Sequence, residues 1–541
     1  MRKTEEILND ILRNRGITDP DDISEFLSER PRKTYDPFLL HNMEAGVDLL
    51  LNEINNGTKI CIYGDYDADG VTSVCILSNA LRMLTDNFTY YIPSRFDEGY
   101  GLNKEAVKKI RVSGAGMIIT VDCGSVSYEE VEYAKELGMK VIVTDHHSID
   151  DIKADCILIN PKQKECSYPF RELAGCGIAF KMVQAIQQRA GLPKSVVTEV
   201  LDLAAVGTVG DIVSLKDENR TIVKYGLNKI NARQRRSLRC LNEKISLKNV
   251  TSENIAFGIA PHINAAGRMA HASEAVELFM SDDETVIRNK ADRLVALNVE
   301  RKKLQEDAYK RCIGMIAGDE NFIILKADDI HEGIAGIVAG KIKENYNRPV
   351  IILTETGEGK LKGTGRSIPS VDIFRLLKKH DSLFERFGGH RSSCGLTMTA
   401  DNYDKLTDAV NEDMTLLLEE NPELFENPLY WDIEISPEEI TVELAREIDR
   451  MEPFGQDNQR PVLLMKHVHI ANIKPMGAEG IHVRFTALSD SGYRSECVLF
   501  QKAHDFEHIL RSGRPVDILG SVSINSWNGR ESSQFIVEEI I

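Results

Sequence analysis

Acidic and histidine side chains follow three apolar segments of this chain, at the points where predicted strands end. The segments are 59–64, 117–121 and 140–144, and the residues that follow them are Asp65, Asp67, Asp69, Asp122, Asp145, His146 and His147. Ligands of an open α/β sheet bind beyond the carboxyl ends of its strands, so we expect these side chains to face one crevice. So many carboxylates cannot stay ionised together unless cations neutralise them. The pattern therefore predicts a metal cluster, and one suited to hydrolysis.

The alternation of Asp65, Asp67 and Asp69 can be explained in three ways. On an extended segment, residues two apart share one face, so the three carboxylates can point the same way. A calcium loop of the EF-hand type needs a Glu at its twelfth position, where this chain has Ile76, and a helix where it has a predicted strand. Acids that merely cap helices or polarise turns would explain one such turn, but not acids after four strands of one α/β unit.

A fourth acid, Asp211, follows segment 204–210, which is apolar and which we also predict to be a strand. Oxygen ligands combined with one or two imidazoles suit Mn²⁺ or Mg²⁺ better than Zn²⁺, which usually takes fewer carboxylates. Two such ions about 3.5–4 Å apart would activate a water molecule and stabilise the leaving oxygen of a displacement at phosphorus. We therefore expect two Mn²⁺ or Mg²⁺ ions and the hydrolysis of a phosphoester.

Four segments of the chain resemble the motifs of a known family. Segments 64–70, 121–124, 144–147 and 209–211 are similar, in order and spacing, to the four motifs of the DHH phosphoesterases. Tyr63 stands where the short-oligonucleotide and pyrophosphate members of that family carry a His, and this form resembles the RecJ single-strand-specific exonucleases.

The resemblance assigns a role to each of the acidic and histidine residues. It implies the following metal ligands: Asp67, Asp69, Asp122, His146 and Asp211. Asp65 would be a metal ligand or an outer-sphere catalytic partner. His147 would sit by the scissile phosphate as a polarising or proton-donating group, and Asp145 of the same motif would be a further catalytic residue.

Glycines lie next to Arg, Ser or His in three later segments, 331–340, 363–367 and 387–390. Without a Cβ atom, glycine lets backbone N–H groups approach a phosphate, and arginine can contact a phosphate through two hydrogen bonds. Each segment alone would equally suit an ordinary turn. Together they resemble the DHH-associated domain, which implies that these residues grip the substrate opposite the metals: Arg366, Ser367, Gly388, Gly389 and His390.

Segment 261–269, which contains Asn264 and Arg268, stands between the two halves. It could simply be a loop that caps the following helix. The RecJ family carries a similar Asn-Ala-x-Gly-Arg element here, which implies that Asn264 and Arg268 contact the substrate at the cleft.

The elements that would position these residues divide the chain into five parts. Short β-branched runs alternate with amphipathic stretches in two regions, which predicts two α/β domains. Apolar residues recur at helical spacing between Ile287 and Cys312, so we expect a rigid connecting helix between them. The expected parts are a helical N-terminal segment (1–57), a parallel-sheet DHH catalytic domain (58–283), the connecting helix (284–318), a DHH-associated α/β domain (319–425) and an OB-fold β-barrel (430–541).

The last part of the chain has short strands and turns, which is the composition of a small β-barrel. Segment 452–458 resembles the segment that leads into the oligonucleotide-binding barrel of the RecJ family. Beyond it, lysines and arginines are interleaved with Phe485, Tyr493, Phe500 and Trp527, and single-strand binders combine such cations with aromatic stacking. Core packing is the simpler role for any one of these aromatics. The part as a whole predicts a nucleic-acid-binding barrel.

The composition limits the class of protein and its partners. Hydrophobic content of 42% is ordinary for a globular protein, and its apolar runs are shorter than the roughly 20 residues of a membrane span. Ten cysteines without a C-x-x-C pair favour reduced thiols and a cytoplasmic location, with no membrane partner. The net charge of −18 disfavours DNA binding over the whole surface, although not on a local basic stripe.

These observations and the resemblance together predict a Mn²⁺- or Mg²⁺-dependent exonuclease that degrades single-stranded DNA in repair and recombination. The 5′→3′ direction and the release of mononucleotides are implied by the family alone. A helicase and a single-strand-binding protein are candidate partners that would supply the substrate. The chain ends at the predicted barrel, so we do not expect contacts that larger relatives make through a further C-terminal domain.

Two other functions compete with this prediction. A phosphatase of short oligonucleotides or adenosine bisphosphate, from the same superfamily, would not need a barrel. A binding protein that has lost its metals would have replaced motif acids, and this chain retains each of them. Cleavage of a long strand, compared with cleavage of a dinucleotide, separates the first of these from the exonuclease.

Overall fold

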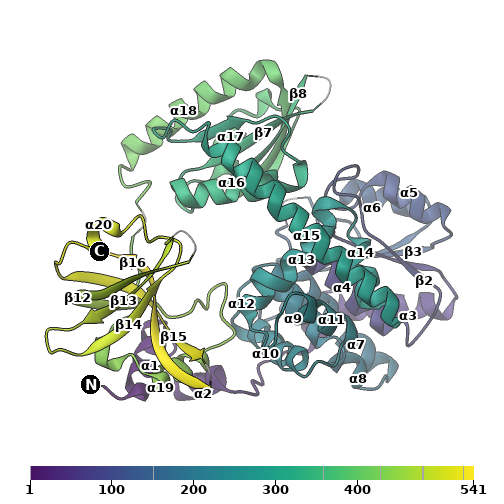
Figure 1. Cartoon of the computed structure of the whole chain (residues 1–541). Helices are drawn as coiled ribbons and strands as arrows, with labels where there is room; N and C mark the ends of the chain where they lie inside the picture. Colours follow the sequence, from purple (N-terminus) through teal and green to yellow (C-terminus); the bar gives the residue numbers. More distant parts are fainter. Residues whose placement is uncertain (1, 150–151, 357–358, 427, 478–479, 528) are drawn as a thin grey trace.

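The computed structural model of this protein describes residues 2–149, 152–356, 359–426, 428–477, 480–527 and 529–541. Three sheets organise the described residues, and each lies in a separate lobe of the molecule (Figure 1). Two lobes combine a sheet with helices and the third is a barrel, so the predicted fold class is confirmed. None of the described helices is long and apolar enough to cross a lipid bilayer.

The first α/β domain is built on a five-stranded sheet. Its strands are β1 Ile60–Gly64, β2 Phe88–Tyr91, β3 Met117–Val121, β4 Lys140–Thr144 and β5 Ile157–Ile159. They are all parallel and their spatial order is β2-β1-β3-β4-β5. Gly64 pairs with Val121, and Val121 pairs with Thr144. Because β1, β3 and β4 end level, the acidic residues that follow them start at one edge of the sheet.

Helices surround this sheet and extend the domain on one side. They are α3 Met43–Asn55, α4 Ala68–Leu81, α5 Lys104–Val112, α6 Tyr128–Glu136, α7 Gly175–Ala190, α8 Ser195–Thr198, α9 Leu201–Gly210, α10 Asp217–Asn231, α11 Arg236–Lys244, α12 Ser252–Asn254, the π-helical turn η2 Ile255–Ile259, α13 Ala260–Met269 and α14 Ser273–Met280. Helix α4 is buried along nearly its whole length, between α7 and α9. A helix that is apolar on all sides belongs at the centre of a domain. Its first turn continues directly from the acids that follow β1.

Segment 204–210 was predicted to be a strand, and this prediction is wrong because the segment belongs to helix α9. A short apolar run does not by itself distinguish a buried helix from a buried strand. Residues Leu201, Asp202 and Leu203 extend the run to ten helical residues, and α9 packs against α4, α7 and α10. Asp211 therefore follows the C-terminal end of a helix rather than the end of a strand.

The N-terminal segment divides between two hydrophobic cores. Helix α1 (Thr4–Asn14) and helix α2 (Pro20–Leu27) place apolar side chains in the core of the barrel. Helix α3, with the 3₁₀ turn η1 (Pro37–Leu39) before it, belongs instead to the first α/β domain. Both ends of the chain therefore lie at the barrel lobe (Figure 1).

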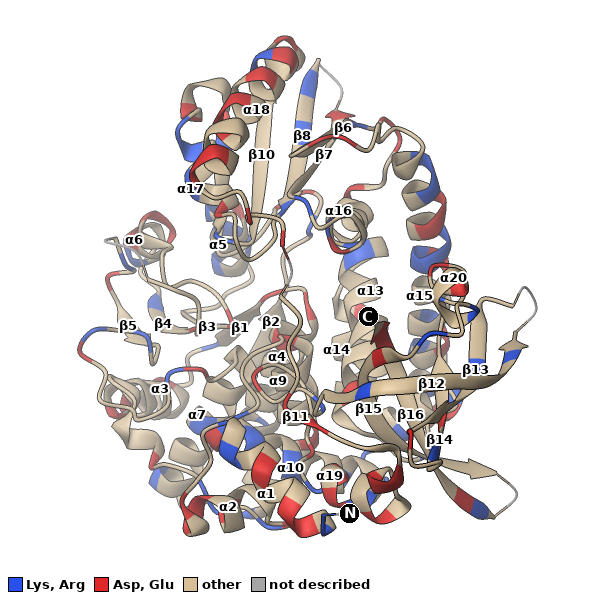
Figure 2. Ribbon diagram, turned by 90° about the vertical axis from the view of Figure 1, so that its left-hand side faces the viewer, with Lys and Arg blue, Asp and Glu red and all other residues tan. Residues whose placement is uncertain are grey.

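Helix α15 (Glu284–Ile313) leads from the first α/β domain to the second, as the connecting helix was expected to do (Figure 1). Basic and acidic residues are interspersed along it (Figure 2). The second sheet has the order β6-β7-β8-β10-β9, in which only β6 and β7 are parallel. Its elements are β6 Ile323–Lys326, α16 Glu332–Tyr346, β7 Val350–Thr356, β8 Lys360–Arg366, α17 Ile373–Lys378, η3 Asp381–Leu383, β9 Arg386–His390, β10 Ser393–Thr399, η4 Ala400–Asn402 and α18 Tyr403–Glu420.

The last lobe is a β-barrel. Its elements are β11 Ile433–Glu434, η5 Pro437–Glu439, α19 Val442–Asp449, β12 Leu463–Met476, β13 His482–Leu488, β14 Arg494–Leu499, α20 Glu507–Leu510, β15 Val516–Trp527 and β16 Arg530–Ile540. The strand order is β11-β12-β13-β14-β16-β15, and β12 also pairs with β15, which closes the sheet on itself.

An ion pair joins α1 to the barrel. Arg15 Nε lies 2.6 Å from Asp432 Oδ1, and Arg15 Nη2 lies 2.9 Å from Asp432 Oδ2. The Asp432 side chain is fully buried and the Arg15 side chain is mostly buried. Loss of one partner of a buried ion pair leaves the other charge uncompensated, which is strongly destabilising.

We expect Arg15→Met to lower the free energy of unfolding of the barrel by about 3 kcal/mol, because the Asp432 carboxylate stays buried without its cation. The two tryptophans of the chain, Trp431 and Trp527, both belong to this part, so urea unfolding followed by tryptophan fluorescence reports on it. Arg13→Met is the matched control, since Arg13 forms an exposed ion pair on the same helix and should change stability by less than about 0.5 kcal/mol. Equal losses in the two variants would contradict the importance of the buried pair.

Candidate metal centre

Polar side chains from four elements meet where β1, β3 and β4 end. Their ligand atoms form three groups, within each of which the atoms lie within 4.8 Å of one another: Asp65, Asp67 and Asp122; Asp69, His146 and Asp211; and Asp122, His146 and His147. Asp122 and His146 each belong to two groups, so the three groups form one continuous cluster.

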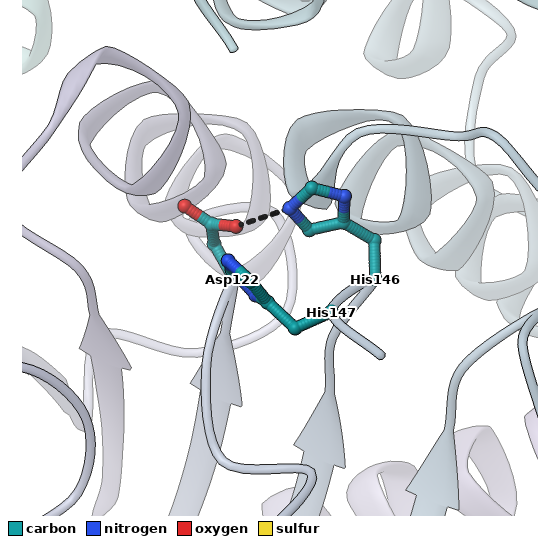
Figure 3. Close-up of side chains that lie close together, drawn as sticks. All are labelled: Asp122, His146 and His147. Carbon is teal, nitrogen blue, oxygen red and sulfur yellow. Dashed lines mark ion pairs between the residues drawn. The ribbon is translucent and has the colours of Figure 1, made fainter. Parts of the chain in front are cut away.

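His146 stands at the middle of this cluster. Its Nε2 lies 3.1 Å from Asp122 Oδ1, 3.5 Å from Asp211 Oδ2 and 3.9 Å from Asp69 Oδ2. Figure 3 shows its imidazole facing the Asp122 carboxylate. Among the described residues, neither ring nitrogen of His146 has a hydrogen-bond partner, and neither does Asp122 Oδ1 or Asp65 Oδ1. Buried polar atoms normally have partners, and cations held in the cluster would supply partners to His146 Nε2, Asp122 Oδ1 and Asp65 Oδ1.

Crowding and burial raise the pKa values of the carboxyl groups. Burial, reinforced by the charge of Asp67, raises the pKa of Asp65 well above its usual range. Burial and the charge of Asp69 have the same effect on the pKa of Asp122. Burial, with the charges of Asp69 and Asp67, raises the pKa of Asp211 to about 9. The cluster cannot be fully ionised unless cations neutralise it.

The donor set fits a hard divalent cation. Burial lowers the pKa of His146 to about 4, so its imidazole is neutral at pH 7 and can bind a metal. Several carboxylate oxygens with one neutral imidazole suit Mn²⁺ or Mg²⁺. The structure thus brings together all six predicted metal ligands, although the role of each as a ligand stays a prediction.

The backbone holds these acids in place. The Asp69 carboxylate accepts hydrogen bonds from Gly175 N at 2.6 Å and Cys176 N at 2.8 Å, in the first turn of α7. Asp67 caps α4 by accepting from its first backbone amides. Asp122 has a φ of 62°, in the left-handed region that Asp adopts more readily than most residues. A Cβ atom on Gly175 would lie 2.5 Å from the Asp122 Cβ, so glycine is required there.

Asp145 and His147 form a pair beside the cluster. His147 Nδ1 lies 2.7 Å from Asp145 Oδ1, and Ser125 N donates to Asp145 Oδ2 at 2.9 Å. Burial alone would lower the pKa of His147, but the hydrogen bond and charge of Asp145 outweigh it and the pKa is raised. Burial would likewise raise the pKa of Asp145, but His147 outweighs it and that pKa is lowered. The Asp145 carboxylate orients the imidazole and favours its protonated form, which suits a proton donor.

Three arginines lie together beside the acids. Arg268 is near the end of α13, Arg366 ends β8 of the second sheet, and Arg95 follows β2. Burial lowers the pKa of Arg268 to about 10, and the charges of Arg95, Arg301 and Arg366 add to this effect. Among the described residues, no carboxylate forms an ion pair with Arg95, Arg268 or Arg366. Clustered guanidinium groups without acidic partners suit a bound phosphate.

Arg95 belongs to this arginine cluster, but the sequence pattern did not indicate it as a site residue. It lies beyond the carboxyl end of β2, and its guanidinium carbon lies 5.0 Å from the centre of the Tyr66 ring. Tyr66 stands between Asp65 and Asp67, so this contact places Arg95 next to the acids. The signal was the same as for the acids, a charged residue after a parallel strand, but segment 88–91 was not recognised as a strand.

Two predicted substrate contacts have structural partners. Asn264 Oδ1 accepts a hydrogen bond from Ala68 N at 2.7 Å and so holds the start of α4 against α13. Ser367 is buried, and its hydroxyl donates to Val371 O at 2.7 Å within a turn. Their contact with a substrate stays a prediction.

The Gly-Gly-His segment lies on β9, the edge strand of the second sheet. A Cβ atom on Gly389 would lie 2.4 Å from Ser393 O, so the pairing of β9 with β10 requires glycine there. Gly388 and His390 are exposed. No described contact links His390 to the arginines or to the metal cluster, so the substrate role of this segment also stays a prediction.

The aromatic residues of the barrel divide into two kinds. Phe485 is fully buried in the core, which is the simpler role considered for each of them. Tyr493, Phe500 and Trp527 are instead 55%, 49% and 74% exposed, so their rings are free to stack on bases.

Three stretches of the chain match known families. Residues 59–208 match the DHH family, N-terminal domain, residues 319–415 match the DHHA1 domain, and residues 431–539 match the RecJ OB domain. Each stretch falls on one of the three sheets described above.

Similar proteins match nearly the whole chain. The single-stranded-DNA-specific exonuclease RecJ of Bacillus subtilis (strain 168) is 36% identical, over 98% of this chain and 67% of that protein. The protein of the same name from Escherichia coli (strain K12) is 32% identical, over 93% of this chain and 90% of that protein. The crystal structure of RecJ in complex with Mn²⁺ from Thermus thermophilus has a TM-score of 0.84 at 28% identity, over 99% of this chain and 76% of that one. The crystal structure of that RecJ in complex with Mg²⁺ has a TM-score of 0.79 at 26% identity, over 99% of this chain and 74% of that one.

We expect Asp122→Asn to have opposite effects on stability without and with metal. In chelator, the variant should melt at a higher temperature than the unmodified chain, because it removes an acid whose ionisation is unfavourable in a crowded, buried cluster. With Mn²⁺ at 100 times its Kd, the unmodified chain should gain about 2.7 kcal/mol, whereas the variant should gain much less. Differential scanning calorimetry in chelator and in Mn²⁺ measures both effects.

Asp86→Asn is the matched control, because Asp86 is exposed and lies outside the cluster. It should melt like the unmodified chain in both conditions. An Asp122→Asn protein that is less stable in chelator, or that gains as much from Mn²⁺ as the control, would contradict the metal assignment.

Proposed function

This chain belongs to the RecJ family of DHH phosphoesterases, and we propose that it is a metal-dependent exonuclease that degrades single-stranded DNA. One observation carries the proposal: a buried cluster of carboxylates and a neutral imidazole lies beside three arginines that have no acidic partner among the described residues. Such a site can hold a phosphodiester between cations and guanidinium groups. The relatives named above are single-stranded-DNA-specific exonucleases, which supports the same substrate here.

The residues that would hold two Mn²⁺ or Mg²⁺ ions fall into two sets: Asp65, Asp67 and Asp122, and Asp69, His146 and Asp211. When bound, such ions supply Lewis acidity and charge neutralisation for an in-line displacement at phosphorus. The hydrogen bonds from the first turn of α7 keep the Asp69 carboxylate oriented, so little reorganisation is needed when the site fills.

His147 would hold a proton at the edge of the cluster. Asp145 fixes the ring by its hydrogen bond to Nδ1, and the Tyr100 hydroxyl lies 3.2 Å from each ring nitrogen. An imidazolium in this position can donate its Nε2 proton toward the oxygen that leaves phosphorus.

Arg95, Arg268 and Arg366 would bind the phosphate at the end of the strand. A terminal phosphate monoester carries more negative charge than a diester, so a cluster of cations favours an end over an internal position. The 5′→3′ polarity and the release of mononucleotides rest on the family resemblance.

The barrel would hold the strand that leads away from the site, through the exposed rings of Tyr493, Phe500 and Trp527. We also propose the boundaries at residues 284, 319 and 430, which agree with the three sheets and the connecting helix. Action in DNA repair and recombination, supply of substrate by a helicase and a single-strand-binding protein, and a cytoplasmic location belong to the same proposal. Ten free cysteines among the described residues support the location.

Digestion of an end-labelled single strand tests this function. We expect release of nucleotides in Mn²⁺ or Mg²⁺, none in chelator, and much slower release from a blunt duplex. Asp122→Ala should reduce the rate by at least about 10³, because it removes a carboxylate shared by two groups of the cluster, while strand binding persists. Cleavage of a dinucleotide without cleavage of the long strand would favour the short-oligonucleotide phosphatase instead.

The arginine cluster predicts a preference for phosphorylated ends. Arg366→Met should slow digestion of a 5′-phosphorylated strand by about 10- to 100-fold, because a charge-assisted hydrogen bond is worth about 1.5–3 kcal/mol. Digestion of a 5′-hydroxyl strand should slow much less, so the ratio of the two rates is the measurement. Arg386→Met, on an exposed position of the same sheet, is the control and should keep the ratio. An unchanged ratio in Arg366→Met would remove this arginine from the terminal phosphate site.

A further inference from the structure

Two aromatic rings, one from each α/β domain, are in contact where these two domains meet. Phe96 lies in the loop between β2 and α5, and His331 is the residue that caps α16. Their ring centroids are 5.4 Å apart and their planes are nearly perpendicular, at 84°. An edge-to-face contact of this kind is favourable for aromatic rings. Both side chains are half-buried, so the contact is not inside a hydrophobic core.

The position of the His331 ring is fixed by its own domain and by the first. His331 Nδ1 accepts a hydrogen bond from Gly333 N at 3.1 Å, which is the cap of α16. Gly333 O in turn accepts from Arg268 Nη1 at 3.1 Å. A Cβ atom on Gly333 would lie 2.1 Å from Arg268 O, so glycine allows the first turn of α16 to rest directly on α13. Figure 2 shows α16 directly above α13, and the two helices are in contact.

This contact lies next to the arginine cluster. Phe96 follows Arg95, which lies against Tyr66 beside the acids. Arg268 belongs to the same cluster and also holds Gly333, two residues from His331. The ring pair therefore adjoins two of the three arginines, Arg95 through the chain and Arg268 through Gly333.

We propose that the Phe96–His331 pair blocks a strand from passing between the two α/β domains beyond the arginines, so that the enzyme accepts only a strand with a free end. The inference rests on the proposed function. A free end can stop at the arginines, and its terminal phosphate then sits among them. A continuous strand would have to place a further nucleotide where the two rings meet. The pair thus acts on specificity, by rejecting strands without ends, and takes no part in the displacement itself.

Covalently closed circular single-stranded DNA tests the proposal against the same DNA made linear with a 5′ phosphate. The unmodified enzyme should digest the linear form and leave the circle intact. Phe96→Ala and His331→Asn, in which Asn keeps the helix cap, should each open circles up to about tenfold faster than the background rate seen with the unmodified enzyme, since one aromatic contact shifts an equilibrium by up to about that factor. Their rates on the linear strand should stay within about threefold of the unmodified rate.

Two further variants serve as controls. Phe96→Tyr keeps the ring and should leave circles intact. Phe257→Ala removes a phenylalanine that is 82% exposed elsewhere on the first domain, and it should also leave circles intact. Thermal melting of each variant shows that it is folded.

Each outcome decides the proposal. Intact circles with Phe96→Ala and His331→Asn proteins that digest the linear strand would overturn it. Cleavage of circles by the unmodified enzyme would overturn it as well. Folded variants that lose digestion of the linear strand would do the same, since the pair would then be needed for cleavage of ends. An unmodified enzyme that leaves the linear strand undigested would instead refute the proposed function.

Discussion

Repulsion between buried carboxylates at the end of three parallel strands governs how this chain is arranged. Burial and mutual charge raise the pKa values of Asp65, Asp122 and Asp211, so these groups are ionised together only when cations neutralise them. The surrounding fold keeps them close in spite of this. Backbone amides in the first turn of α7 donate to both oxygens of Asp69. Asp122 has a left-handed backbone, and Gly175, which lacks a Cβ atom, leaves room for its side chain. Cation binding and the stability of this edge are therefore linked.

The other parts of the chain arrange cations and surfaces around that edge. Arg95, Arg268 and Arg366 come from three different parts of the chain and lie beside the acids. Helix α15 contacts α16, and this contact places the second domain next to these arginines. The barrel is fixed to the same region, because Leu215 N donates to Gln456 O at 2.9 Å, in the loop that follows Asp211. A Cβ atom on Gly455 would lie 2.6 Å from the Leu215 side chain, so this contact requires glycine. The barrel thus has a set position relative to the metal cluster.

Much of the site could be predicted because its signal is local. An apolar run followed by an acid marks the carboxyl end of a parallel strand, and such ends meet at one edge of a sheet. The same reasoning failed for segment 204–210, since a short apolar run has no period that separates strand from helix. It missed Arg95 because the strand before it was not recognised. It also could not tell that Asn264 and Ser367 bind the backbone, because their partners, Ala68 and Val371, are not marked by any pattern.

The order of the residues was enough to establish which chemical groups are present and that most of them follow strands, since strand patterns depend only on neighbouring residues. How close those groups come was settled by the packing of distant segments. The register that makes β1, β3 and β4 end level, the meeting of Arg95, Arg268 and Arg366, and the contact of Phe96 with His331 each join residues far apart in the chain. The burial of these groups and the distances between them set their pKa values and their affinity for anions. That burial and those distances exist only once the domains have packed together.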